Sequence, residues 1–543
     1  MAVTKNQEYT VTVEGYSGEG AGVARIDGFV VFVSGALRGE VCRILILKVL
    51  KSAAFAKVLE VLAPSPHRIT PDCPYFPRCG GCTYRHMDYA EELALKRRRV
   101  QDNLARIGGS EVEVEEILGA AETRRYRNKA QYPVSPDGRI GFYRARTHEV
   151  IDTRECLLVK PEADAAAEAV RQYMRDFRAA GYDERTGRGL LRHVYVRSNT
   201  RDECLICLLV NGKQLPHEAE LVERLRRACP KAVGIVLGEN TRRDNVILGE
   251  RYRTLWGADR LEDALCGRVF RLSVPSFYQV NHEQAERLYA KAIEYAQLTG
   301  EETVLDLYCG AGTITLALAS HAKRVLGAEI VPEAIDDARE NAARSGVENA
   351  EFFCGDASDV AKKLAQENLR PDVITVDPPR KGLAEDVVES IARMQPERVV
   401  YVSCDSATMA RDVKRFAALG YRAVRACAVD LFPRADHVET VAVLSRKSAS
   451  KSFIPVSISP KDMGLSKEKD QPTYANIRDY VQKTHGMKVS SLYVAQMKAE
   501  CGLETQADRS GDKKQPKCPP EKREAILDAF RHFGLIGEDG TEK

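Results

Sequence analysis

The chain has 543 residues, which is more than one hydrophobic core supports, so three or four domains are expected. Hydrophobic residues make up 44% and charged residues 29%, the balance of an ordinary globular protein. The net charge of +3 is too small to indicate nucleic-acid binding by itself, and no apolar run approaches the roughly 18 residues of a membrane-spanning helix, so no membrane partner is expected.

The N-terminus and the cysteine content predict the cellular setting. Residues 1–8 lack the apolar segment of a secretory signal, so a cytoplasmic location is expected. The chain has 15 cysteines, and disulfides are rare in the cytosol, so metal binding or catalysis should account for some of them. Clusters of arginine and lysine at 96–99 and 124–129, with tyrosines interleaved, favour contacts to phosphate groups.

The N-terminal residues show the pattern of short β-strands. Apolar residues alternate with polar ones from Tyr9 to Val13, glycines mark turns, and three further apolar runs follow. This spacing predicts a small closed OB-like β-barrel over residues 5–63. Barrels of this kind commonly bind nucleic acid, and a purely structural module is the alternative.

A loop rich in proline and glycine carries Cys73, Cys79 and Cys82 in a C-x5-C-x2-C array. Thiolates gather in such a loop when a soft cation binds them, which indicates zinc or an iron–sulfur cluster. Zinc sites usually have two C-x2-C pairs, and no second pair follows nearby, so a four-iron cluster is favoured. Cys156 is the nearest downstream candidate for a fourth ligand. A chance cluster of cysteines is the alternative.

Residues 64–275 are predicted to form a central α+β domain that contains this loop. The residues from 165 to 174 have a helical pattern, and two apolar runs starting at Leu190 and Glu203 resemble paired strands. Cys204 and Cys207 show C-x2-C spacing but lie within the second run. We therefore expect these two cysteines in the hydrophobic core rather than at a metal.

From residue 276 to 446, apolar strands alternate with helices, as in a Rossmann-like parallel sheet. The first strand leads into a loop with Gly310 and Gly312, where the backbone can approach a ligand closely. The next three strands end in Glu329, Asp356 and Asp377. Acidic residues at the ends of successive strands favour a methyltransferase with a nucleoside cofactor over a dinucleotide dehydrogenase.

A further buried strand, residues 399–403, ends at Cys404, and a helical pattern begins three residues later. Ligands bind at the carboxyl ends of strands in such sheets, and a nearby helix N-terminus lowers the pKa of a thiol. A reactive cysteine is therefore predicted here, with a structural cysteine as the alternative. Residues 447–543 are expected to form a Lys/Ser-rich linker and a helical C-terminal extension, for which an RNA-binding role and a plain structural role are both open.

Residues 8–446 resemble the iron–sulfur-containing RNA 5-methyluridine methyltransferases, the bacterial 23S rRNA uracil-5-methyltransferases of the RlmD/RumA type. The resemblance covers the N-terminal barrel, which is a TRAM domain in that family, and also the cysteine loop and the methyltransferase domain. The motifs that carry it begin at Cys73, Ser276, Asp306, Asp377, Ser403 and His437. Two departures are Asp405, where the family often has asparagine, and the long C-terminal extension.

The resemblance implies methyl transfer from S-adenosylmethionine to C5 of uracil in RNA. Cys404 resembles the nucleophile that adds to C6, and Glu439 the general base that removes the C5 proton. Further family positions match the residues expected to contact the cofactor, namely Gln279, Tyr308, Gly310, Gly312, Thr313, Glu329, Asp356 and Asp377. The ligands of a 4Fe-4S cluster are then expected to be Cys73, Cys79, Cys82 and Cys156.

The expected substrate is 23S rRNA, and tRNA is the alternative, because cluster-bearing relatives act on both. The family resemblance also implies a monomer. Two rival functions are a radical methyltransferase, whose C-x3-C-x2-C spacing differs from the spacing here, and a non-catalytic iron–sulfur RNA-binding protein. The nucleophile, base and cofactor loop in one chain argue against the second rival.

Overall fold

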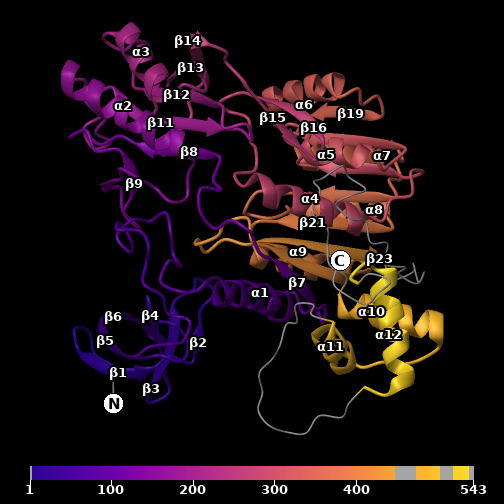
Figure 1. Ribbon diagram of the computed structural model, residues 1–543. Coiled ribbons are helices and arrows are strands. Elements are labelled where there is room, and N and C mark those ends of the chain that lie inside the picture. The colour runs from indigo at the N-terminus through magenta and orange to yellow at the C-terminus, as the bar shows by residue number, and fades with distance from the viewer. Residues whose placement is uncertain (1–2, 447–472, 502–517, 537–543) are drawn as a thin grey trace. The chain divides into compact units, whose positions relative to one another are not determined.

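The computed structural model describes residues 3–446, 473–501 and 518–536. The chain divides into a large unit, Met1–Gly464, and a small unit, Leu465–Lys543 (Figure 1). Among the described residues, no helix has the length and apolar character needed to cross a membrane. The predicted domain boundaries at residues 63/64, 275/276 and 446/447 stay predictions.

The N-terminal part of the large unit is one strongly curved sheet. Apolar side chains alternate along its longest central strands, so that Cys42, Ile44 and Ile46 face the inside. The strands β1 and β2 form the two edges and do not pair with each other, so the sheet is a half-barrel rather than the closed barrel that we predicted. The strand order is β1-β5-β6-β4-β3-β2, with bounds β1 (Glu8–Thr12), β2 (Gly15–Tyr16), β3 (Gly22–Ile26), β4 (Phe29–Ser34), β5 (Val41–Val49) and β6 (Ala53–Ala63).

The next helix and strand, α1 (Tyr89–Arg106) and β7 (Val114–Leu118), join the last sheet of the large unit. Helix α1 begins at Asp88, whose side chain accepts a hydrogen bond from the backbone N–H of Glu91. In the middle of α1 the fully buried Lys96 donates to Glu92 and to Asp430, both at 2.7 Å. This buried ion cluster fixes α1 to the loop that follows β22 (Tyr421–Val429), because each of the three charges would be costly to bury alone.

The central part is an α+β domain around a five-stranded sheet of order β14-β13-β12-β11-β8. As predicted, the runs from Leu190 and Glu203 form an antiparallel pair, and Cys204 and Cys207 are fully buried in the core. The elements are β8 (Lys129–Pro133), β9 (Gly141–Tyr143), β10 (Val150–Asp152), α2 (Pro161–Phe177), β11 (Leu191–Ser198), β12 (Cys204–Val210), α3 (Glu218–Ala228), β13 (Ala232–Glu239) and β14 (Arg251–Gly257).

The last part of the large unit is the predicted Rossmann-like α/β domain, whose eight-stranded sheet has the order β19-β18-β17-β20-β21-β23-β22-β7. The remaining elements of this domain are β15 (Leu261–Leu265), β16 (Arg268–Leu272), α4 (His282–Ala296), β17 (Thr303–Leu307), α5 (Thr313–Ala319), β18 (Arg324–Glu329), α6 (Pro332–Arg344), β19 (Ala350–Cys354), α7 (Ala357–Gln366), β20 (Val373–Val376), α8 (Glu385–Met394), β21 (Arg398–Ser403), α9 (Ser406–Ala418) and β23 (Glu439–Arg446).

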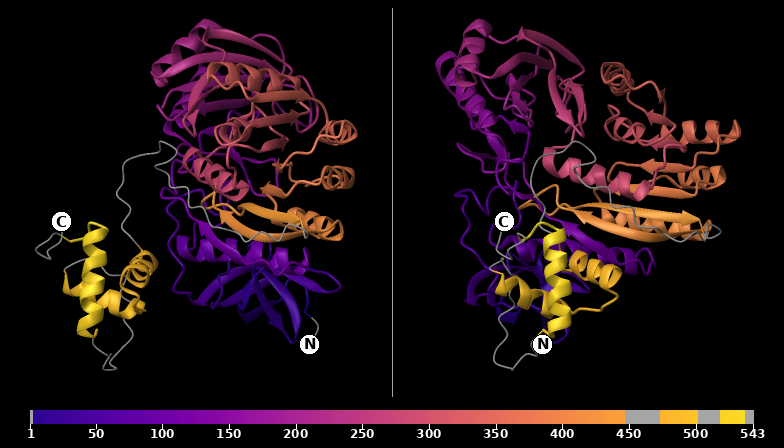
Figure 2. Two further views of the ribbon diagram at one scale, coloured as in Figure 1. Left: turned by 90° about the vertical axis from the view of Figure 1, so that its right-hand side faces the viewer. Right: turned by 45° about the vertical axis from the view of Figure 1, so that its right-hand side comes forward.

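Helices cover both faces of this sheet (Figure 2). Residues of α1, α7, α8 and α9 share one apolar cluster with the sheet, and residues of α4, α5 and α6 share another. The neighbouring strands β19, β18, β17, β20 and β21 are all parallel. The order of the strands changes direction between β17 and β20. Ligands bind at such a switch point, outside the carboxyl ends of the strands.

The small unit contains the three helices expected from the sequence, α10 (Tyr474–His485), α11 (Ser491–Glu500) and α12 (Pro520–His532). Thr473 and Ser490 cap the first two helices by accepting backbone N–H bonds. Apolar side chains from all three helices, among them Ile477, Val494 and Phe530, form one core. The predicted Lys/Ser-rich linker lies outside the described residues.

Candidate active site

A buried carboxylate holds the first strand of the candidate site in place. Asp306 near the end of β17 is 1% exposed and accepts hydrogen bonds from the hydroxyls of Thr315 in α5 and Thr375 in β20, at 2.6 and 2.7 Å. Burial raises the pKa of Asp306 to about 6. The Asp306 side chain thus links β17, β20 and α5 at the point where the strand order changes direction.

The loop after β17 has the left-handed backbone that its glycines suit. Tyr308, Gly310 and Gly312 have φ angles of 69°, 55° and 81°. A Cβ atom on Gly310 would meet open space, whereas one on Gly312 would lie 3.2 Å from Ala338 and 3.3 Å from a ring atom of Phe352. Gly310 therefore borders open space that a ligand can occupy, whereas Gly312 allows the loop to pack closely against Ala338 and Phe352.

The predicted acidic residues lie at the same edge of the sheet. Glu329, at the end of β18, accepts a hydrogen bond of 3.2 Å from the backbone N–H of Gly310, so it borders the glycine loop. Ile330 and Val331 follow it and are 58% and 46% exposed, an apolar surface beside the carboxylate that sequence reasoning did not single out. Asp356 caps α7 by accepting a hydrogen bond from the backbone N–H of Ser358, and its predicted contact with the cofactor stays a prediction.

Strand pairing brings Cys404 and Glu439 together. Strands β21 and β23 are antiparallel, and Ser403 lies opposite Thr440. Cys404 directly follows the first strand and Glu439 begins the second, so both lie at the edge that carries the glycine loop. Glu439 is 3% exposed, and its carboxylate accepts no hydrogen bond within the described part of the chain. The two residues predicted for catalysis are therefore neighbours although 35 positions separate them in sequence.

The thiol of Cys404 does not have the lowered pKa that we expected from a helix N-terminus. Burial, Glu439 and Asp377 together raise the pKa of Cys404 to about 11, and Arg380 opposes the rise. In addition, Asp405 caps α9 and accepts the backbone N–H groups of Ala407 and Thr408 at 2.9 and 3.0 Å. The N–H groups that were expected to favour the thiolate are already paired with a carboxylate.

The neighbouring carboxyl groups share this environment. Burial raises the pKa of Glu439 to about 8, with a further rise from Asp377, and burial raises the pKa of Asp377 to about 7. Arg380 opposes the shift of Glu439, and its guanidinium lies 3.0 Å from Nε2 of His437. Arg380 and His437 lie within the recognised motifs, but their part in the electrostatics of the site emerges only from the folded chain.

Gln279 is held in a loop before α4. It is 6% exposed, and its backbone carbonyl accepts a hydrogen bond of 2.9 Å from the amide of Asn128. Ser276 in the same loop donates to Asp337 at 2.6 Å, and Arg197 donates to the carbonyl of Ser276 at 2.5 Å. The loop is thus fixed from the central domain and from α6. Its neighbour Phe277 is 61% exposed, a surface aromatic residue that sequence reasoning did not single out.

The four cysteines predicted as metal ligands line one small cavity. Its remaining wall is largely aromatic and aliphatic, with Phe76, Phe142 and Leu158 among the lining residues. Arg85 donates to the sulfur of Cys82 at 3.2 Å, and the N–H of Gly81 donates to the sulfur of Cys79 at 3.4 Å. Burial raises the pKa of Cys79 to about 11 and that of Cys82 to about 12.

The cavity does not have the arrangement of a site for one metal ion. Within residues 3–446, 473–501 and 518–536, no three His, Cys, Asp or Glu side chains converge closely enough to hold a single ion. The four thiols instead surround a space whose interior they share with apolar side chains. The described structure thus brings the predicted ligands together and leaves the kind of ligand open.

Comparison with known proteins agrees with this architecture. The profile of the tRNA (Uracil-5-)-methyltransferase family matches residues 88–447, and the profile of the TRAM domain matches residues 2–59. An uncharacterized RNA methyltransferase of Clostridium tetani is 41% identical over 449 residues, which are 82% of this chain and 98% of that protein. An uncharacterized RNA methyltransferase of Halalkalibacterium halodurans is 44% identical over 451 residues, which are again 82% of this chain and 98% of that protein.

A solved structure is also similar over most of the large unit. The tRNA (uracil-54, C5)-methyltransferase of Pyrococcus abyssi, solved with S-adenosyl-L-homocysteine, is 27% identical to this chain. The match has a TM-score of 0.66 and covers 80% of this chain and 99% of that one. Because the family profile spans more than half of the 543 residues, the chain belongs to the TRAM-domain RNA (uracil-5-)-methyltransferases and is an enzyme of that family.

Proposed function

We propose that this protein methylates C5 of a uridine in 23S rRNA, with S-adenosylmethionine as the methyl donor, Cys404 as the nucleophile and Glu439 as the general base. The observation that carries the proposal is the β21–β23 register, which puts this thiol and this carboxyl side by side at the edge that carries the glycine loop. One chain supplies every residue of the proposed site, so we propose that the monomer is active.

The chemistry explains the need for both groups. C5 of uracil is a weak nucleophile, and addition of the Cys404 thiolate at C6 converts the C4–C5 part of the ring into an enolate. When bound, S-adenosylmethionine supplies the electrophilic methyl group that C5 then attacks. Glu439 removes the remaining C5 proton, the electron pair re-forms the C5–C6 double bond, and the thiolate leaves C6. The target base must leave any stack to reach the site.

The proposed cofactor contacts come from the glycine loop and the strand ends around it. Gly310 and Gly312 allow close approach of the backbone, and Glu329 offers a carboxylate for ribose hydroxyls. Tyr308, Thr313, Asp356, Asp377 and Gln279 complete the proposed set. The Pyrococcus abyssi structure, which contains S-adenosyl-L-homocysteine, supports a cofactor of this class.

The choice of RNA rests on different observations. The cysteine array and the motif order favour 23S rRNA, because they resemble the rRNA-modifying branch of the family. A tRNA substrate is the second candidate, and the similarity to a tRNA (uracil-54, C5)-methyltransferase favours it. The geometry of the site is compatible with either RNA, because recognition of RNA depends on its shape and on splayed bases.

Methyl transfer to unmodified bulk RNA tests the proposal. Protein purified without oxygen is incubated with labelled S-adenosylmethionine and with rRNA or tRNA from cells lacking the modification, and the labelled nucleoside is identified and mapped. We expect 5-methyluridine in 23S rRNA. Label in tRNA alone would replace the proposed substrate, and the absence of label from both RNAs would refute the enzymatic proposal for this chain.

We further propose that Cys73, Cys79, Cys82 and Cys156 hold a 4Fe-4S cluster that stabilises the central domain. A 4Fe-4S cluster needs four thiolates around a shared space, and these four cysteines line one cavity. A single ion would need ligands that converge more closely than the described side chains do. When bound, the cluster would favour thiolates whose pKa values burial otherwise raises, and Arg85 beside Cys82 would offset part of its negative charge.

Removal of one ligand tests the cluster. We expect Cys82→Ser to lower the iron and acid-labile sulfide bound per chain at least severalfold, because a cluster with three thiolates is held less firmly. Cys266→Ser, a half-buried cysteine outside the cavity, is the matched control and should keep both elements. Wild-type protein with zinc in place of iron and sulfide would contradict the proposal.

A further inference from the structure

We propose that the cysteine loop, residues 73–82, positions the general base Glu439 through the connection between β22 and β23. This connection consists of residues 430–438, and we call it the base segment because Glu439 directly follows it. The inference deepens the proposed function, on which it rests, by assigning positioning roles to residues that lie outside the reacting pair.

The end of the cysteine loop is bonded to the backbone of the base segment. Thr83 and Tyr84 directly follow Cys82. Their N–H groups both donate to the carbonyl of Arg434, at 2.8 and 3.1 Å. Arg434 has a φ angle of 70°, a left-handed conformation that is unfavourable for a residue with a side chain and persists only where its surroundings hold it. A change in the cysteine loop therefore acts directly on the base segment.

A tyrosine of the central domain provides a second link. The hydroxyl of Tyr126 donates to the carbonyl of Pro433 at 3.0 Å. Tyr126 is buried in the same apolar cluster as Cys156, and Cys82 packs against that cluster. The part of the central domain that carries the predicted metal ligands therefore holds the base segment at two neighbouring carbonyl groups.

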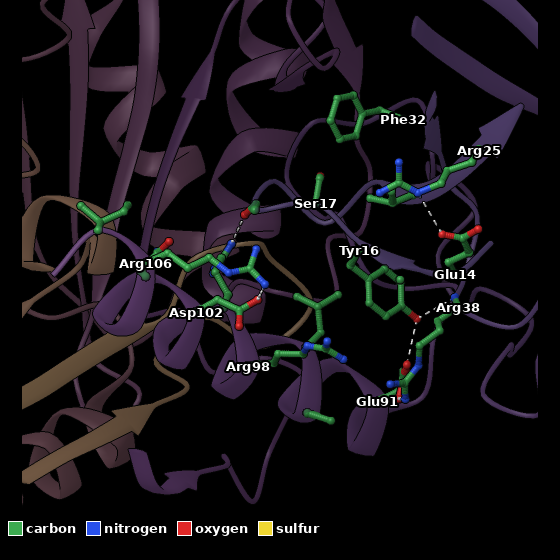
Figure 3. A pocket seen from close by; sticks show the side chains of 18 residues that line it. Glu14, Tyr16, Ser17, Arg25, Phe32, Arg38, Glu91, Arg98, Asp102 and Arg106 are labelled. Carbon is green, nitrogen blue, oxygen red and sulfur yellow. Dashed lines mark hydrogen bonds and ion pairs between the residues drawn. The ribbon is translucent and has the colours of Figure 1, made fainter. Parts of the chain in front are cut away.

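Helix α1 supports the base segment from another side. Lys96 donates to the carbonyl of Phe432 at 3.0 Å. The helix is itself fixed to the N-terminal part of the chain, because Glu91 accepts hydrogen bonds from Tyr16 at 3.0 Å and from Arg38 at 3.2 Å (Figure 3). The carbonyls of residues 432, 433 and 434 are thus held by α1, by the central domain and by the cysteine loop.

The rest of the base segment is short and packed. Four residues lie between Arg434 and Glu439. Val438 is buried in the core, and the ring of His437 packs against that of Phe432, with centroids 5.8 Å apart. Close-packed interiors transmit displacements, and a misplacement of about 1 Å at a reacting group can cost about 10²-fold in rate. Loss of a link should therefore slow removal of the C5 proton.

Removal of one hydroxyl group tests this positioning. Tyr126→Phe deletes the hydrogen bond to Pro433 and keeps the buried ring. We expect single-turnover methyl transfer to slow about tenfold and the covalent complex between Cys404 and RNA to accumulate severalfold, because the step that Glu439 performs is the one affected. KM for RNA and the affinity for S-adenosylmethionine should stay within about twofold of the wild type. Denaturing electrophoresis measures the complex.

A second buried tyrosine in the central domain is the matched control. The hydroxyl of Tyr173 in α2 donates to the carbonyl of Pro216, so Tyr173→Phe removes the same kind of hydrogen bond far along the chain from the base segment. Both variants should have similarly lowered melting temperatures, and only Tyr126→Phe should transfer methyl groups slowly and accumulate the complex. Equal transfer rates and equal levels of complex in the two variants would overturn the role of Tyr126.

Hydrogen exchange follows the link from the cysteine loop without requiring turnover. In Cys82→Ser, the backbone N–H groups of residues 430–438 should exchange at least severalfold faster than in the wild type, because loss of a ligand loosens the end of the loop. Cys266→Ser should keep the wild-type exchange rates in these residues. Mass spectrometry of peptides from the full-length protein gives the rates. Wild-type exchange in Cys82→Ser would overturn the part assigned to the cysteine loop.

The outcomes separate this inference from the proposed function. If the wild type transfers no methyl group but Tyr126→Phe and Cys82→Ser both speed exchange in residues 430–438, the proposed function is refuted and the structural links are confirmed. If the wild type is active and both variants keep its exchange rates and its level of covalent complex, the positioning is refuted and the proposed function stands.

Discussion

Replacing Cys404 with alanine should lower the rate of methyl transfer on the order of 10⁴-fold, because without the thiolate no enolate forms at C5. The thiol is half-buried at the end of β21, so the smaller side chain should leave the fold and the cofactor loop intact. Single-turnover transfer from labelled S-adenosylmethionine to the identified RNA gives the rate, and equilibrium dialysis gives the affinity for the methyl donor.

A cysteine elsewhere in the same sheet provides the control. Cys427 in β22 is fully buried, and Cys427→Ala should keep activity within a few fold while it costs some stability. Activity of Cys404→Ala equal to that of this control would refute covalent catalysis by Cys404. A loss of donor binding in Cys404→Ala would show that the residue acts through the cofactor site instead.

The second large effect concerns Glu439. The substitution Glu439→Gln should lower turnover about 10²- to 10⁴-fold and trap a covalent complex between Cys404 and the methylated RNA, because no base removes the C5 proton. The negative charge of Glu439 helps to raise the pKa of Cys404, so its removal favours the thiolate and the first addition. Denaturing electrophoresis detects the complex, and mass spectrometry of the digested complex locates the bond.

Two further variants make the trapping experiment specific. No complex should form when Cys404→Ala is combined with Glu439→Gln. Glu397→Gln, a substitution of an exposed carboxylate at the opposite end of β21, should turn over as the wild type does. A Glu439→Gln enzyme that releases product at the wild-type rate would exclude Glu439 as the base.

The pH dependence of the wild-type rate of methyl transfer also tests the role of Glu439. The pKa of Glu439 is raised to about 8, and the base must be ionised to accept a proton, so its active fraction grows as pH rises toward and past 8. The pKa of Cys404 is raised to about 11, and its thiolate fraction also grows with pH. Both shifts have the same sign, so the single-turnover rate should increase from pH 7 to pH 9. A rate that falls over this interval would contradict these assignments.

Much of the fold was predictable because its determinants are local in sequence. Short apolar runs alternating with helical patterns predicted the parallel sheet, and the glycine loop after β17 and the acidic strand ends marked the edge at which we propose that the cofactor binds. The helices of the small unit were predicted for the same reason. Closure of the N-terminal sheet was predicted wrongly, since pairing between the edge strands β1 and β2 depends on curvature that a strand pattern does not encode.

The sequence by itself determined which residues are available for chemistry, because the motifs that carry Cys404, Glu439 and the first three cysteines of the array are each short and contiguous. Only the tertiary structure decided how these residues act on one another. The register of β21 with β23 sets the neighbours of Cys404, and Asp405 takes the N–H groups that were expected to lower its pKa. The hydrogen bonds between the central domain and the base segment likewise exist only after folding, because they join segments that are distant in sequence.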